Sequence, residues 1–128
     1  MKLSNFFFCL MLVLVVAACN DDDTDDCIQS DWVGTYTGTA ICDGTTDSVS
    51  VTITASGSEA VIIEYELGGL TTTYDPITPV GCVIDYSATQ NGLTADLDAT
   101  LNMDNLTFTD VLSGNGQSIT CNITATRD

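Results

Sequence analysis

Apolar and polar residues alternate one by one along much of the chain, which is the two-residue period of a β-strand with one buried face. Val49, Val51 and Ile53, for example, are separated by Ser and Thr residues. Residues 59–67, 93–101 and 118–125 show the same alternation. No segment after Cys27 has the period of a helix, and Thr, Val and Ile are frequent, so the pattern predicts an all-β fold.

Short runs of Gly, Asn, Asp and Ser lie between these segments and are typical of hairpin turns. The stretch from Asp75 to Gly81 is expected to be a longer loop, because Pro76 and Pro79 cannot donate to a ladder. About eight strands follow from this spacing, at roughly 32–41, 47–55, 59–67, 70–75, 82–89, 93–101, 105–112 and 117–126.

Links this short favour antiparallel neighbours along the chain, which is an up-and-down meander. Eight such strands can close into a small barrel in which the first strand pairs with the last. A β-sandwich is the alternative, although its crossing connections need longer links than most of those present.

The first residues have the features of an export signal. Lys2 precedes an apolar run from Phe6 that, at about 13 residues, is too short to span a bilayer as a helix. The following Val16-Ala17-Ala18-Cys19 resembles the lipobox of bacterial lipoproteins. The resemblance implies that residues 1–18 are a signal peptide and that Cys19 becomes the lipidated first residue of the mature protein.

Residues 19–26 then contain five Asp in a run that cannot collapse, so we expect a lipidated, acidic tether. A calcium loop is the alternative, but the run lacks the Gly turn and distant Glu of an EF-hand. An acidic run directly after the lipid Cys resembles the surface-export signal of Bacteroidota lipoproteins. That implies an outer-membrane, lipid-anchored protein whose remaining residues, 27–128, face the periplasm or the cell surface.

The expected first strand carries a further resemblance. Trp32, Gly34 and Gly38 lie in Trp-Val-Gly-Thr-Tyr-Thr-Gly, which is similar to the opening strand of lipocalin-like barrels, and the strand pattern of residues 31–128 fits that family. It implies a small lipocalin-like β-barrel that binds a ligand. This chain lacks the length and the terminal helix of usual lipocalins, which argues against a large internal cavity.

Four cysteines remain after the lipobox, Cys27, Cys42, Cys82 and Cys121. An even number in an exported chain predicts two disulfides. If the barrel closes, Cys42 at the end of the first strand lies near Cys121 in the last, so we prefer Cys42–Cys121 with Cys27–Cys82, and the other two connectivities stay open. A four-thiolate zinc site is disfavoured because there is no C-x-x-C pair.

Charge excludes several classes of function. The chain has 18 Asp and Glu, 2 Lys and Arg and no His, for a net charge of -16. So few cations argue against nucleic-acid binding, and the missing His removes Ser-His and Cys-His catalysis and His metal sites. Since no phosphate-binding or dinucleotide-binding glycine motif is present either, we expect neither an enzyme nor a bound cofactor or metal.

A ligand-binding module is the favoured function. Aromatic side chains offer flat apolar faces to a small apolar or glycan-like ligand, and the candidates are Trp32, Tyr36, Tyr65, Tyr74, Tyr86 and Phe108. Asp85 and Asp110 interrupt apolar strands and are the candidate polar contacts. The alternative is a structural or protein-interaction surface lipoprotein, such as an inhibitor or an accessory subunit, with a filled barrel. An open cavity in the barrel would favour the ligand-binding module, and a filled interior would favour the structural or protein-interaction role.

Overall fold

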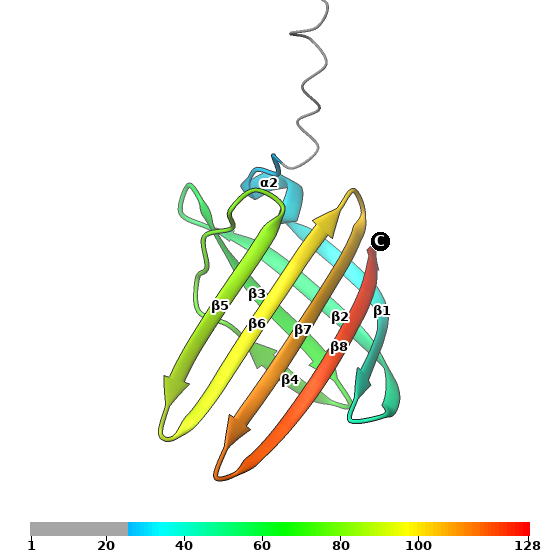
Figure 1. Cartoon of the computed structure of the whole chain (residues 1–128). Coiled ribbons are helices and arrows are strands. Elements are labelled where there is room, and N and C mark those ends of the chain that lie inside the picture. The colour runs from blue at the N-terminus through cyan, green and yellow to red at the C-terminus, as the bar shows by residue number, and fades with distance from the viewer. Residues whose placement is uncertain (1–25) are drawn as a thin grey trace, which may run out of the picture.

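A computed structural model describes residues 26–128, and the residues expected to form a signal peptide, the lipidated Cys19 and most of the acidic tether (1–25) lie outside the described part. The described chain forms one sheet of eight antiparallel strands and one short helix (Figure 1). The elements are α2 (Gln29–Trp32), β1 (Gly34–Cys42), β2 (Thr45–Ser56), β3 (Ala60–Leu67), β4 (Leu70–Thr73), β5 (Val83–Gln90), β6 (Leu93–Asn102), β7 (Asn105–Gly114) and β8 (Gln117–Arg127).

The strand order is β4-β3-β2-β1-β8-β7-β6-β5, so every consecutive pair except β4 and β5 is hydrogen-bonded, and the first strand pairs with the last. The predicted all-β up-and-down meander is therefore confirmed. All the strands belong to one continuous sheet, which excludes the β-sandwich alternative. The sheet curls into a half-barrel, with β1–β4 behind β5–β8 in Figure 1.

The sheet differs from a closed barrel at β4 and β5, which form its two edges. After Thr73 the chain stays beside β3, where Ile77 exchanges two backbone hydrogen bonds with Val61. Pro76 lies within this stretch and has no amide proton, so regular pairing ends there. The chain then crosses to β5, leaving the two edges unpaired with each other.

The half-barrel has two different ends. At one, which we call the capped end, α2 covers the interior and the disulfide between Cys27 and Cys82 fixes it to the start of β5. At the other, the hairpin end, lie the turns β1–β2, β3–β4, β5–β6 and β7–β8. Asp43, Asn91 and Asn115 have positive φ in three of these turns, and each precedes a Gly that also has positive φ. This is the conformation that two-residue hairpins favour.

The predicted faces of the strands are confirmed. Val49, Val51 and Ile53 are buried on the concave side, and their Ser and Thr neighbours point outward. The large buried side chains lie mostly toward the capped end. They include Trp32, Tyr36, Ile53, Ile63, Ile84, Leu97, Leu106 and Ile123.

Gly38 allows β1 to approach β8 closely. A Cβ at this position would lie 1.9 Å from the backbone oxygen of Thr124 and 2.6 Å from the Cα of Ala125. Neither atom can move without shifting β8, so a side chain is excluded here. Gly38 therefore permits close packing between the first and last strands.

Candidate functional site

A cavity of ≈ 560 Å³ lies in the half-barrel toward the hairpin end, between the two unpaired edges and the concave face of the sheet. Tyr65 of β3 and Tyr74, just after β4, line one side. Tyr86 of β5 and Asp110 of β7 also line it. Its volume is within the range of small-molecule sites.

Space is left here because the concave face carries small residues near the hairpin end. Ala88 and Ala95 are opposite each other on β5 and β6, and both line the cavity. At the capped end the corresponding space is filled by Trp32 and Tyr36, which are fully buried. The strands thus enclose a filled half and a hollow half.

Asp110 is the buried polar residue of the concave face. It follows Leu106 and Phe108 in the alternation of β7 and is 7% exposed, so its carboxylate is largely removed from solvent. The Tyr65 hydroxyl donates a hydrogen bond to Oδ2 of Asp110. No group in residues 26–128 donates to Oδ1, which is also buried. Such an oxygen has lost its water without gaining a partner, and this is costly unless a ligand supplies a donor.

Two tyrosine hydroxyls beside this carboxylate have altered acidity. Burial raises the pKa of Tyr65 well above its usual value, and the hydrogen bond to Asp110 raises it further. Burial also raises the pKa of Tyr74, and the hydrogen-bonding interaction of its hydroxyl with the Asp110 carboxylate raises it further; this hydroxyl lies near the carboxylate without a well-formed hydrogen bond to Oδ1. Both hydroxyls therefore stay protonated over the physiological range and act as donors in the cavity.

Aromatic rings hold the two sides of the cavity together. Tyr74 and Tyr86 meet edge to face across the unpaired sheet edges, with ring centroids 5.6 Å apart. Tyr65 packs against Phe108 at the same centroid distance, with the ring planes inclined by 55°. Edge-to-face pairs of this kind are favourable beyond their buried area, so these contacts fix the ring positions at the site.

Part of the rim is aliphatic. Leu93, Leu112 and Ile119 line the cavity and are 44%, 45% and 50% exposed, although their strands turn them toward the concave side. Inward-facing aliphatic side chains that remain this accessible make part of the mouth apolar, beside the polar Gln90 and Asn91, which also line the cavity. The cavity therefore combines a partly apolar mouth, tyrosine walls and one buried carboxylate.

Four of the residues predicted to contact a ligand line this cavity, namely Tyr65, Tyr74, Tyr86 and Asp110. Phe108 is close by, but it packs behind Tyr65 as part of the core. The prediction for Asp85 was wrong, because its side chain points outward, where it is exposed and opposite Asp98 of β6.

The predictions for Trp32 and Tyr36 as ligand contacts were also wrong. Trp32 is the last residue of α2 rather than the start of a strand, and both side chains are fully buried in the core at the capped end. Trp32 donates its indole N–H to the Gly81 carbonyl at 3.1 Å. The Tyr36 hydroxyl donates to the Trp32 carbonyl at 2.9 Å. Both satisfied groups hold α2 in place and are not available to a ligand.

The sequence did not single out the aliphatic rim. Ile119 was already expected on the same face as Cys121, and Leu112 follows Asp110 by two residues, so strand alternation was the available signal. The sequence indicated the cavity only weakly, through Ala88 and Ala95, whose side chains are too small to fill the interior.

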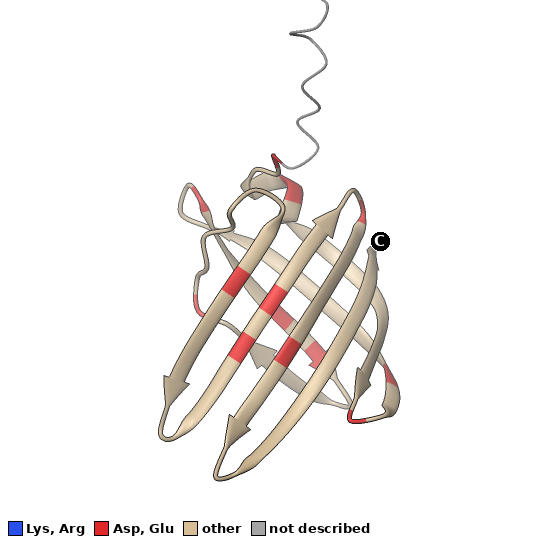
Figure 2. Ribbon diagram, in the orientation of Figure 1, with Lys and Arg blue, Asp and Glu red and all other residues tan. Residues whose placement is uncertain are grey.

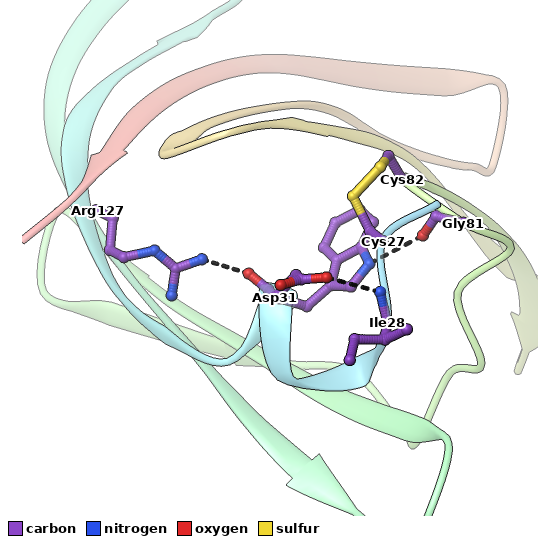
Figure 3. The surroundings of a disulfide bond; sticks show 7 residues. Cys27, Ile28, Asp31, Gly81, Cys82 and Arg127 are labelled. Carbon is purple, nitrogen blue, oxygen red and sulfur yellow. Dashed lines mark hydrogen bonds between the residues drawn. A yellow bond between two sulfur atoms is a disulfide. The ribbon is translucent and has the colours of Figure 1, made fainter. Parts of the chain in front are cut away.

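The disulfides are the preferred pair, Cys27–Cys82 and Cys42–Cys121. Figure 3 shows the first of these beside Asp31, whose carboxylate accepts a hydrogen bond from the Ile28 amide at 2.8 Å. The Arg127 guanidinium donates to the Asp31 backbone carbonyl (Figure 3) and to that of Val33, the latter at 2.5 Å. The Cys27–Cys82 disulfide and these hydrogen bonds, together with the contacts of Trp32 and Tyr36, hold α2 against the capped end.

Acidic residues are spread over turns and strands in residues 26–128 (Figure 2). Within that range no three Asp, Glu or Cys side chains are grouped so that they could hold a metal ion. The same residues contain no helix that is long and apolar enough to span a membrane. Comparisons with protein-family models, with curated proteins and with solved structures each found no match.

Proposed function

We propose that this protein is a non-catalytic binding module of the cell envelope, anchored in the outer membrane through Cys19, that holds a small ligand in the half-barrel cavity. The observation that carries the proposal is the buried, unpartnered Oδ1 of Asp110 in a cavity with tyrosine walls. A structural lipoprotein with a filled barrel would need neither the hollow nor an unsatisfied carboxylate.

The point at which the described chain begins also supports the proposal. The described chain begins at Asp26, next to Cys27, and therefore at the capped end. The cavity lies toward the opposite, hairpin end. A lipid on Cys19 would thus place the capped end nearer the membrane and leave the partly apolar mouth directed away from it.

Blocking the cavity tests ligand binding. We expect some members of a panel of small amines, alcohols and sugars to raise the melting temperature of the wild-type protein, because a ligand stabilises the state it binds. Ala88→Trp, which fills the hollow, should abolish the increase. Thr89→Trp places the same indole on the outer face of β5 and should preserve it. Failure of every compound to stabilise the wild type would overturn the proposal.

The anchor needs a separate test. Labelled fatty acid should be incorporated into the wild-type protein in cells and not into a Cys19→Ala variant, and that variant should leave the membrane fraction without detergent. A Cys19→Ala protein that remains membrane-bound would remove the lipid anchor from the proposal while leaving ligand binding in place.

A further inference from the structure

The charge of the cavity restricts what it can bind. Asp110 and Asp75 both line it, and no Lys or Arg does. Arg127 is the only basic residue in the described part, and it is engaged at the capped end with Asp31, Val33 and Asp104. An anionic ligand would therefore bring a negative charge to buried and surrounding negative charges without any compensating cation.

One oxygen of the Asp110 carboxylate accepts a hydrogen bond and the other accepts none, although the Tyr74 hydroxyl lies near the carboxylate. Tyr65 donates to Oδ2, and Oδ1 is buried without a donor. A neutral hydroxyl could supply one donor, but a cationic donor forms a stronger, charge-assisted hydrogen bond and also offsets the buried negative charge.

The walls suit the same ligand chemistry. Tyr65, Tyr74 and Tyr86 line the cavity together with Asp110, and an aromatic face attracts a cation that comes within about 6 Å of its centre. The edge-to-face contact of Tyr74 with Tyr86 keeps two of these rings in fixed orientation. The rim of Leu93, Leu112 and Ile119 would contact the apolar remainder of the ligand.

We infer that the cavity is a site for organic cations, and specifically for a primary ammonium group on a small apolar or aromatic body. The ammonium donates to Oδ1 of Asp110 beside the tyrosine rings, and the apolar body fills the mouth. This inference rests on the proposed ligand-binding function and adds the charge and the donor group of the ligand.

A series of compounds of nearly equal shape tests the inference. Titration calorimetry on the wild-type protein would compare 2-phenylethylammonium, neutral 2-phenylethanol and anionic phenylacetate. We expect the ammonium ion to bind on the order of 10- to 100-fold more tightly than the alcohol, as a charge-assisted bond predicts, and the carboxylate to bind most weakly.

Two matched variants locate the effect. Asp110→Asn keeps the shape and an acceptor for Tyr65 but removes the charge, and it should bring the ammonium affinity down to that of the alcohol. Asp85→Asn removes one charge from the outer face, and its ammonium affinity should stay within about 2-fold of wild type, because exposed charges are well screened. The wild-type series remains decisive if Asp110→Asn does not fold.

The failures are distinguishable. Equal wild-type affinities for ammonium and alcohol, or a preference for phenylacetate, would overturn the cation inference and leave a ligand-binding cavity. The cation inference would also be overturned if none of the three compounds binds while other compounds raise the melting temperature of the wild type but not that of Ala88→Trp. If no compound at all stabilises the wild type, the proposed function fails together with the inference.

Discussion

Cys42 and Cys121 lie directly opposite each other on β1 and β8, with their Cα atoms 4.1 Å apart, so a disulfide joins the first strand of the sheet to the last. It closes a sequence separation of 79 residues, and Cys27–Cys82 closes one of 55. Each disulfide lowers the conformational entropy of the unfolded chain by closing a loop. Because this effect changes slowly with loop length, the two disulfides are expected to stabilise the fold to a similar extent.

Removing either disulfide should therefore destabilise the protein to a similar extent. We expect Cys42→Ala with Cys121→Ala, and separately Cys27→Ala with Cys82→Ala, to lower the free energy of unfolding by about 2–4 kcal/mol. Urea denaturation of the two double variants checks this. A reduced wild-type protein with the urea midpoint of the oxidised protein would contradict it.

Arg127 should be important for stability at the capped end. Its guanidinium carbon lies 4.9 Å from the centre of the Tyr36 ring, and its N–H groups satisfy the carbonyls of Asp31 and Val33. Arg127→Ala removes a donor from the part-buried Val33 carbonyl and from the exposed Asp31 carbonyl, and it removes the contact with the Tyr36 ring, so we expect a loss of about 1–3 kcal/mol in the free energy of unfolding.

Asp104 provides the control for the ion pair of Arg127. Nε of Arg127 is 3.2 Å from Oδ1 of Asp104, whose side chain is 71% exposed. Because exposed ion pairs contribute little, Asp104→Asn should cost less than about 1 kcal/mol. A larger loss for Asp104→Asn than for Arg127→Ala would mean that the ion pair, and not the carbonyl and ring contacts, stabilises this end.

Alkaline pH should destabilise the fold through the cavity tyrosines. The pKa values of Tyr65 and Tyr74 are raised in the folded state, so the unfolded chain loses these protons first as the pH increases. Their contribution is complete below about pH 10, the ordinary tyrosine pKa, and is lost as the pH rises above it.

Unfolding measured at intervals from pH 8 to pH 12 should show this decline. Tyr65→Phe removes one of the ionising groups, so its stability should fall less steeply above about pH 10, even though the variant is less stable at pH 8 because Oδ2 of Asp110 loses its donor. Parallel curves for the two proteins would contradict the assignment to Tyr65.

The outer face contains an unfavourable pair. Asp85 and Asp98 are directly opposite on β5 and β6, and both are exposed. Asp98→Asn should raise the free energy of unfolding by about 0.2–1 kcal/mol at low salt, since like charges in register repel. Glu66→Gln on β3 also removes one exposed charge but faces Ser50 and Thr71, so it should stabilise less. Equal gains would indicate a general charge effect.

The sequence predicted the strands well because two independent signals agreed. Alternation marked their lengths, and pairs such as Asn91-Gly92 marked their turns, so the sheet followed from local patterns. The pairing of Cys42 with Cys121 followed from placing the first strand beside the last. The closed barrel was not predictable in this way. Whether β4 and β5 pair depends on the path that the chain takes around Pro76 and Pro79 after it has run beside β3.

The site was less predictable, because it depends on which side of a strand each residue faces. Val83, Ile84 and Tyr86 are all apolar or aromatic, so the pattern around Asp85 fits either orientation, and a shift of one residue reverses the faces. Asp110 lies two residues after Phe108 in a clear alternation, and its inward position could be predicted. Trp32 was misplaced because a helix of four residues has no detectable period.

The unpaired edges have a consequence for chain connectivity. The segment from Asp75 to Gly81 is the link between a first unit, α2 with β1–β4, and a second unit, β5–β8. Both disulfides join one unit to the other, and so does the ladder between β1 and β8. A protease cut in this link would therefore leave two fragments in one covalently joined, folded particle, which would separate only after reduction and unfolding. Continuity of the main chain is dispensable between β4 and β5, where the sheet itself is not continuous.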